Sequence, residues 1–153
     1  MTDLVKTLTD KKLTIGSIES MTGGLFASTI TSIAGSSKVF KGSVVSYSPL
    51  IKENVVGVKE ETIKKFGVVS KEVAYEMAVK GRQLLDVDIC VSVTGNAGPT
   101  CEPGQAGVGE VYIGVSTSKE TVVISKKFEG DRYKIREEAL LSMKEEVLIL
   151  LEN

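Results

Sequence analysis

Three side chains that could act in nucleophilic catalysis, Ser20, Tyr47 and Lys52, stand at or just beyond the ends of apolar segments. The 153 residues include no histidine, so Ser-His-Asp and Cys-His catalysis within one chain is excluded. If Ser20 is a nucleophile, its general base must be a lysine, a tyrosine or a carboxylate. A lysine can serve when burial or a nearby positive dipole lowers its pKa.

Each of these residues also has a plain structural interpretation. Lys52 fits a surface lysine on a short helix, and Tyr47 fits an aromatic residue that packs at a strand end. Glu19, beside Ser20, could orient a base or face solvent. The residue types alone therefore leave catalysis and simple packing both open.

The turn Thr22-Gly23-Gly24 joins an apolar run that begins at Leu13 to a helical pattern from Gly24 to Ala34. Free backbone N–H groups at the start of a helix attract phosphate or carboxylate groups. Turns of this kind are also common as simple connections in α/β proteins. The segment from Leu13 to Gly24 is thus a candidate anion site with Ser20 at its edge.

Composition narrows the classes of function. Nineteen basic and twenty acidic residues give a net charge of −1, which does not indicate nucleic acid or an anionic membrane as a partner. The first twelve residues contain no apolar core of signal-peptide length, and no apolar run is long enough for a membrane span, so we expect a cytoplasmic location. Cys90 and Cys101 have no metal-site spacing and suggest no disulfide framework, so we expect no metal or cofactor.

Periodicity predicts an α/β fold, a three-layer α/β/α sandwich with a mixed, mostly parallel sheet, as a single domain over residues 1–153. A helix around Leu4 to Leu8 comes first, and a helix capped by Asp131 comes last. Between them we expect strands near 13–18, 39–47, 89–94, 111–115 and 121–128, and helices near 24–34, 52–56, 62–66 and 70–85.

One long irregular stretch, Gly95 to Gly109, contains five glycines and two prolines. A loop of this length inside a compact domain is usually functional or mobile. Loops that leave the carboxyl ends of parallel strands gather at one edge of the sheet. Ser20, Tyr47 and this loop all follow predicted strands, so we expect them to share a crevice.

Several short blocks along the chain share an order and spacing with a known family. They are Glu19-Ser20-Met21-Thr22-Gly23-Gly24, Ala34-Gly35-Ser36-Ser37, Val44-Val45-x-Tyr47-Ser48 with Lys52, Thr94-Gly95-x-Ala97-Gly98-Pro99 and Gly130-Asp131-Arg132. From about Leu4 to Leu150 the sequence resembles the CinA C-terminal domain family, and within it the stand-alone nicotinamide-nucleotide amidohydrolases often called PncC.

This resemblance implies hydrolysis of nicotinamide mononucleotide to nicotinic acid mononucleotide and ammonia, a step of pyridine-nucleotide salvage. It implies that Ser20 is the nucleophile and that Tyr47 and Lys52 activate it and shuttle its proton. The oxyanion is expected at backbone N–H groups around Thr22, Gly23 and Gly24. Phosphate recognition is expected around Ser36, Ser37, Gly95, Asn96, Ala97 and Gly98. A small-molecule nucleotide as partner and a homo-oligomeric state are expected in the same way.

The sequence departs from the family pattern at Met21, Pro49, Asn96 and Gly107. Pro49 matters most, because it could reset the turn that delivers Lys52. Asn96 is expected to face the pocket and to affect the choice of substrate. Two other functions remain open at this point: a catalytically silent module that binds a pyridine nucleotide, and an assembly domain that uses the Gly-rich loop.

Overall fold

A five-stranded sheet forms the centre of the structure, a computed structural model that describes residues 1–152. Its strand order is β2-β1-β3-β4-β5. β1 runs parallel to β2 and to β3, whereas β4 runs antiparallel to both β3 and β5. Only β4 is therefore reversed, as the predicted mixed, mostly parallel sheet requires. The strands are β1 Ile15–Glu19, β2 Phe40–Val45, β3 Ile89–Gly95, β4 Glu110–Ser116 and β5 Thr121–Lys127.

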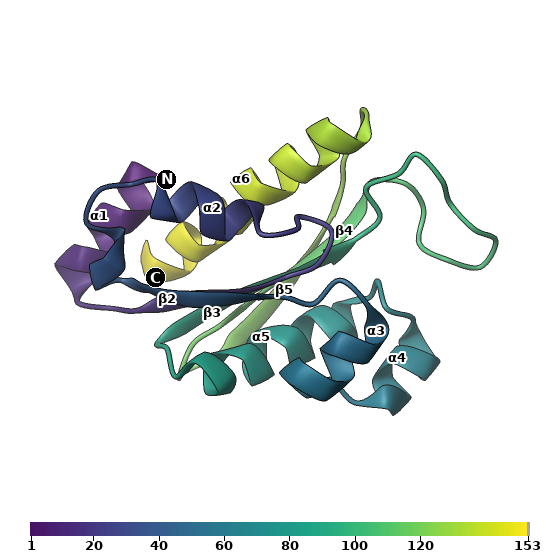
Figure 1. The fold of residues 1–153 in the computed structure, drawn as a ribbon, viewed down its shortest axis with the longest axis horizontal. Helices are drawn as coiled ribbons and strands as arrows, with labels where there is room; N and C mark the ends of the chain where they lie inside the picture. The colour runs from purple at the N-terminus through teal and green to yellow at the C-terminus, as the bar shows by residue number, and fades with distance from the viewer. Residues whose placement is uncertain (153) are drawn as a thin grey trace.

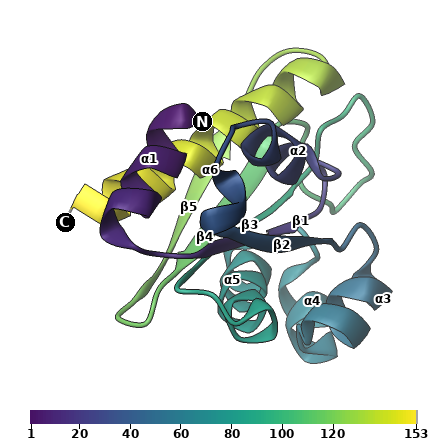
Figure 2. The same cartoon turned by 60° about the vertical axis from the view of Figure 1, so that its left-hand side comes forward.

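Helices cover both faces of this sheet (Figure 1). One face carries α1 Thr2–Lys11, α2 Leu25–Thr31 and α6 Arg132–Glu152. The other carries α3 Pro49–Ile51, α4 Glu60–Phe66 and α5 Lys71–Leu85, and the turned view shows the same separation (Figure 2). Two short helical turns, η1 Ser36–Lys38 and η2 Lys52–Val56, flank β2 and α3. The three-layer sandwich expected from the sequence is confirmed.

The core lies on both sides of β1 and β3, because these central strands are buried on both faces. All five residues of β1 are buried. A large apolar cluster that includes Phe26 fills the side of α1, α2 and α6, and a smaller one around Ile18 and Met77 lies under α5. α5 packs very close to β1 at Gly81, where an added Cβ would lie 2.2 Å from the Cγ1 atom of Ile18.

Side-chain caps set several element ends where the sequence predicts them. The Ser70 hydroxyl accepts a hydrogen bond from the Val73 N–H at 3.3 Å, and the Asp131 carboxylate accepts one from the Lys134 N–H at 2.8 Å. The predicted hairpin between β4 and β5 is also present, with residues 117–120 as its turn. Over residues 1–152, no helix has the length and apolar character needed to cross a membrane.

α2 is shorter than expected and ends at Thr31 rather than at Ala34. Hydroxyl groups in its last turn explain the early end. The Thr31 side chain donates to the Ala27 carbonyl at 2.7 Å, and the Ser32 side chain donates to the Thr29 carbonyl at 2.7 Å. Such bonds compete with the regular backbone ladder and disfavour continuation of the helix.

Candidate active site

Ser20 and Lys52 meet just beyond the carboxyl end of β1. The Lys52 Nζ donates a hydrogen bond to the Ser20 Oγ at 2.8 Å and a second one to the backbone carbonyl of Ser46. The lysine side chain is 1% exposed and has no carboxylate partner among the ion pairs of the described residues. Burial disfavours its charged form and lowers the pKa of Lys52 to about 8. Two groups predicted from the sequence are thus in contact, in a geometry that suits proton transfer.

The chain delivers Lys52 to this position through a short helix followed by a π-helical turn. Pro49 occupies the first turn of α3, where its missing N–H costs no helical bond. The Ser48 hydroxyl caps this helix by accepting from the Ile51 N–H at 3.3 Å. The Lys52 carbonyl then accepts from the N–H groups of the two residues that follow η2, each at 3.0 Å. Pro49 therefore fits the turn that brings Lys52 to Ser20.

A cavity of about 470 Å³ opens beside this pair. Its walls come from the ends of β1, β2 and β3, from the turn between α4 and α5, from the Gly-rich loop and from the start of α6. The shared crevice expected for loops after parallel strands is present. Besides Ser20 and Lys52, the lining includes Met21, Tyr47, Pro49, Phe66, Val68, Thr94, Gly95, Asn96, Ala97, Glu102, Gln105 and Arg132.

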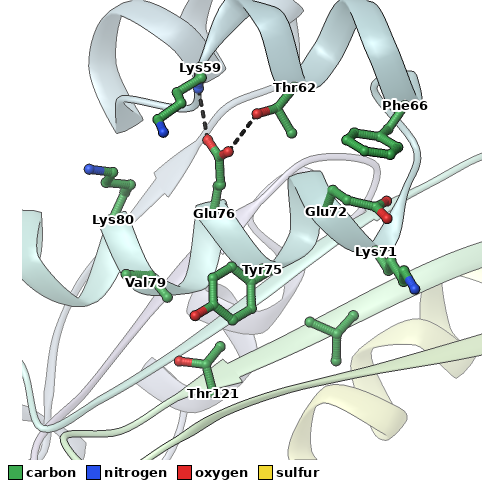
Figure 3. A pocket seen from close by; sticks show the side chains of 11 residues that line it. Lys59, Thr62, Phe66, Lys71, Glu72, Tyr75, Glu76, Val79, Lys80 and Thr121 are labelled. Carbon is green, nitrogen blue, oxygen red and sulfur yellow. Dashed lines mark hydrogen bonds between the residues drawn. The ribbon is translucent and has the colours of Figure 1, made fainter.

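A second hollow, of about 590 Å³, lies between α4, α5 and β5 (Figure 3). It contains neither Ser20 nor Lys52. Glu76 stands in it and accepts hydrogen bonds from the Lys59 N–H at 2.8 Å and from the Thr62 hydroxyl at 2.5 Å, so this carboxylate caps the start of α4. This hollow therefore lacks the Ser20–Lys52 pair that borders the smaller cavity.

Glu19 neither faces solvent nor contacts Lys52. Its side chain is fully buried at the start of α2, although no cation pairs with it among the described residues. The carboxylate accepts from the Thr22 hydroxyl at 2.7 Å and from the N–H groups of Gly24, Phe26 and Ala27 at 2.9, 3.2 and 2.9 Å. The positive end of this helix is therefore occupied by the chain's own carboxylate.

The expectation that Thr22, Gly23 and Gly24 bind substrate with their N–H groups stays a prediction, and this arrangement does not favour it. The Gly24 N–H and the Thr22 hydroxyl are bound to Glu19, and the Gly23 N–H donates to the Ser20 carbonyl at 3.0 Å. None of the three residues lines the cavity. Over residues 1–152, the backbone N–H groups of Met21 and Thr22 have no hydrogen-bond acceptor, but Thr22 is fully buried and of the two only Met21 lines the cavity.

Tyr47 lines the cavity but its hydroxyl contacts neither Ser20 nor Lys52. The ring is 61% exposed, and its hydroxyl accepts from the Arg132 Nη2 at 2.9 Å. The Arg132 Nη1 in turn donates to the Gly98 carbonyl at 2.6 Å. Arg132 therefore ties the segment after β2 to the Gly-rich loop. The part of Tyr47 in proton transfer stays a prediction.

The Gly-rich loop is held in shape by Asn96. The side-chain amide of this residue donates to the carbonyls of Thr100 at 3.1 Å and Ala106 at 2.9 Å, and its oxygen accepts from the Gly98 N–H at 2.8 Å. Gly95, Asn96 and Ala97 line the cavity, and the carbonyl of Gly98 binds Arg132. Asn96 thus borders the cavity while its polar atoms bind the loop itself.

Ser36 and Ser37 lie away from the cavity. They belong to η1, which precedes the start of β2, whereas Ser20 follows the end of the parallel neighbour β1. The six residues of β2 therefore separate the two places, about 20 Å at about 3.3 Å per residue. The expectation that these serines bind the phosphate of a substrate at Ser20 stays a prediction, and this separation does not favour it.

Two arginines at the start of α6 were missed as functional residues. Arg132 lines the cavity, and Arg136 donates to the carbonyls of Met21 at 3.0 Å and Thr22 at 2.9 Å. The block Gly130-Asp131-Arg132 was the signal in the sequence that could have pointed to Arg132. No local pattern indicated Arg136, because it acts across more than one hundred residues of sequence.

The sequence and the fold of this chain are both similar to those of known proteins. The CinA-like protein of Flavobacterium psychrophilum is 50% identical over 125 residues, which are 82% of this chain and 29% of that protein. The crystal structure of a competence or damage-inducible protein from Enterobacter asburiae superposes with a TM-score of 0.93 at 28% identity, over 98% of this chain and 97% of that one. The competence/damage inducible protein CihA of Agrobacterium tumefaciens gives a TM-score of 0.90 at 31% identity, over 99% and 92% of the two chains.

The chain spans about a third of the length of the curated relatives it matches. The model of the CinA C-terminal domain family matches nearly the whole chain, residues 1–150. The sequence blocks that gave the resemblance all lie within this range. The chain therefore belongs to the CinA C-terminal domain family.

Proposed function

We propose that this protein is an amidase that hydrolyses the carboxamide of nicotinamide mononucleotide, with Ser20 as nucleophile and Lys52 as general base. One observation carries the proposal. The Lys52 Nζ lies 2.8 Å from the Ser20 Oγ, inside a cavity, with a pKa lowered to about 8. A lysine whose pKa is lowered toward neutral pH supplies, in its unprotonated form, the base that a chain without histidine needs.

In the first half of the reaction, the Ser20 Oγ attacks the carboxamide carbon while its proton passes to the neutral Lys52 Nζ. The carbonyl π electrons move to oxygen and form a tetrahedral oxyanion. This intermediate collapses when Lys52 returns the proton to the amide nitrogen, and the C–N bond breaks with release of ammonia. An ester between Ser20 and the nicotinoyl group remains.

In the second half, water attacks the ester carbon and gives a proton to Lys52. The ester C–O bond then breaks, Ser20 recovers its proton from Lys52, and the product forms as a carboxylic acid, which gives its own proton to solvent and becomes a carboxylate. In each half of the reaction, Lys52 thus acts first as a base and then as an acid.

The cavity supports a small-molecule substrate. Its volume of about 470 Å³ falls in the range of about 300 to 1,000 Å³ that is usual for ligand sites. The guanidinium of Arg132 stands at its border and is a candidate partner for a phosphate group. The resemblance to nicotinamide-nucleotide amidohydrolases supplies the rest of the substrate assignment.

Ammonia release from nicotinamide mononucleotide tests the proposal. We expect turnover by the parent protein and its loss, by about 1,000-fold or more, in Ser20→Ala and in Lys52→Ala. Both variants should keep the far-ultraviolet circular dichroism of the parent. A matched lysine variant, Lys38→Ala, changes an exposed residue outside the cavity and should keep full activity.

The alternative is a silent nucleotide-binding module. It predicts no ammonia release by the parent protein, together with a rise in melting temperature on addition of the nucleotide. The assembly domain predicts neither effect. These three outcomes separate the three hypotheses.

A further inference from the structure

The turn after Ser20 is held from two sides. On the inner side, the buried Glu19 carboxylate accepts from the Thr22 hydroxyl and from N–H groups at the start of α2. On the other side, Arg136 of α6 donates from its Nε to the Met21 carbonyl at 3.0 Å and from its Nη2 to the Thr22 carbonyl at 2.9 Å. A planar guanidinium thus binds two successive carbonyls as a fork.

Holding a carbonyl also fixes the direction of the N–H group in the same peptide unit. In a planar trans peptide, the C=O and the N–H of the next residue point to opposite sides. The bond from Arg136 to the Thr22 carbonyl therefore fixes the Gly23 N–H. The bond from the Gly23 N–H to the Ser20 carbonyl fixes the Met21 N–H in the same way.

The Met21 N–H is a donor of this turn for which residues 1–152 offer no acceptor. Met21 lines the cavity next to Ser20. A guanidinium bound to a carbonyl also polarises the peptide unit and strengthens its N–H as a donor. The Met21 N–H is therefore oriented through the Gly23 N–H and Arg136, and it is unoccupied beside Ser20.

We infer that Arg136 is a positioning residue, which holds this turn so that the Met21 N–H stabilises the oxyanion formed when Ser20 attacks. This inference rests on the proposed function for the identity of the nucleophile. Arg136 itself does not line the cavity. Its effect is transmitted through the backbone of the turn, from the first part of the last helix to the end of the first strand.

Arg136→Lys tests the inference, because a lysine keeps the positive charge and loses the fork. Loss of a whole oxyanion donor slows turnover by about 100-fold to 1,000-fold, and a displaced donor should slow it by about 10-fold to 100-fold. We expect this fall in kcat with KM unchanged within about twofold. Arg82→Lys, at an arginine of α5 outside the cavity, is the matched control and should change neither constant.

A second readout does not depend on the natural substrate. An alkyl fluorophosphonate forms a bond between phosphorus and the Ser20 Oγ, while the P–F bond breaks, fluoride leaves and Lys52 takes the serine proton. The phosphoryl oxygen then occupies the place of the oxyanion. We expect Arg136→Lys to slow this labelling by about as much as it lowers kcat, with Ser20→Ala as the unlabelled control.

The outcomes separate this inference from the proposed function. Absence of ammonia release by a parent protein that is labelled, and labelled more slowly after Arg136→Lys, would overturn the substrate and support the role of Arg136. Labelling at the parent rate, or no labelling of the parent at all, would overturn the inference. If Arg136→Lys melts at a much lower temperature, Arg136→Gln provides the same comparison with an amide donor, read at a temperature where both proteins are folded.

Discussion

Replacing Lys52 by methionine should change how the stability of this protein depends on pH. A lysine with an ordinary pKa of 10.5 in the unfolded chain and about 8 in the folded one loses its proton earlier in the folded state. Between these two values the unfolded chain therefore binds more protons than the folded protein. Since stability rises with pH wherever the unfolded state binds more protons, Lys52 makes the parent protein more stable as pH rises through this window.

The magnitude follows from the two pKa values. From about pH 7 to about pH 9.5, the free energy of unfolding of the parent should rise by about 2 kcal/mol relative to that of Lys52→Met. The variant also loses the hydrogen bonds to the Ser20 hydroxyl and the Ser46 carbonyl. Any change of these bonds with the protonation of Lys52 is already contained in its folded-state pKa, and the part that does not depend on pH cancels in the difference.

Urea unfolding followed by far-ultraviolet circular dichroism at the two pH values gives this difference directly. Tyrosine fluorescence is unsuitable because phenol groups begin to ionise near the upper value. Lys38→Met controls for the replacement of a lysine by methionine at an exposed site. Equal changes of the free energy of unfolding with pH in the parent and in Lys52→Met would refute the argument that burial lowers the pKa of Lys52.

Further predictions concern catalysis and packing. The value of kcat/KM should rise with pH and level off above about pH 8, because Lys52 must be neutral to accept a proton; initial rates of ammonia release that fall over this range would contradict this. Glu19→Gln should lower the free energy of unfolding by about 2 kcal/mol in urea titrations, since an NH₂ group then faces backbone N–H donors. Gly81→Ala should cost about 2 kcal/mol in the same assay, and an unchanged value would mean that Ile18 gives way. Tyr47→Phe should raise KM about threefold and leave kcat unchanged if this hydroxyl acts by holding the arginine at the cavity border, whereas a large fall in kcat would instead assign it to proton transfer.

Local sequence patterns predicted most of the fold because the elements carry consistent local signals. Alternating or continuous apolar runs mark the strands, and residues such as Ser70 and Asp131 mark the helix starts. The apolar pattern predicts that α2 ends at Ala34, which is too late. The pattern does not show that the Thr31 and Ser32 hydroxyls bond to preceding carbonyls and end the helix early. Residues 52–56 form a π-helical turn rather than the predicted short helix, and no pattern in the sequence distinguishes the two.

The site was predicted in part, and the division has a physical basis. Ser20 and Lys52 could be predicted because serine and lysine are residue types with suitable chemistry. Each also comes after a predicted strand, and the carboxyl ends of parallel strands lie at the same end of a sheet. The role of Glu19 could not be predicted, because the sequence does not show whether a glutamate beside a candidate nucleophile faces solvent or accepts hydrogen bonds from the first N–H groups of a helix. Arg136 depends on where the last helix crosses the first turn, which only the assembled fold determines.

The two ends of the described chain lie on the same side of the molecule. The start of α1 packs against α6, where Lys144 forms an ion pair with Asp3 at 2.8 Å, and the Gly-rich loop lies at the other end of the sheet (Figure 1). A polypeptide fused at either end would therefore leave the surface remote from the entrance to the cavity. The matched curated relatives are about three times as long as this chain, and a segment joined at either end of this fold would begin away from the Gly-rich loop.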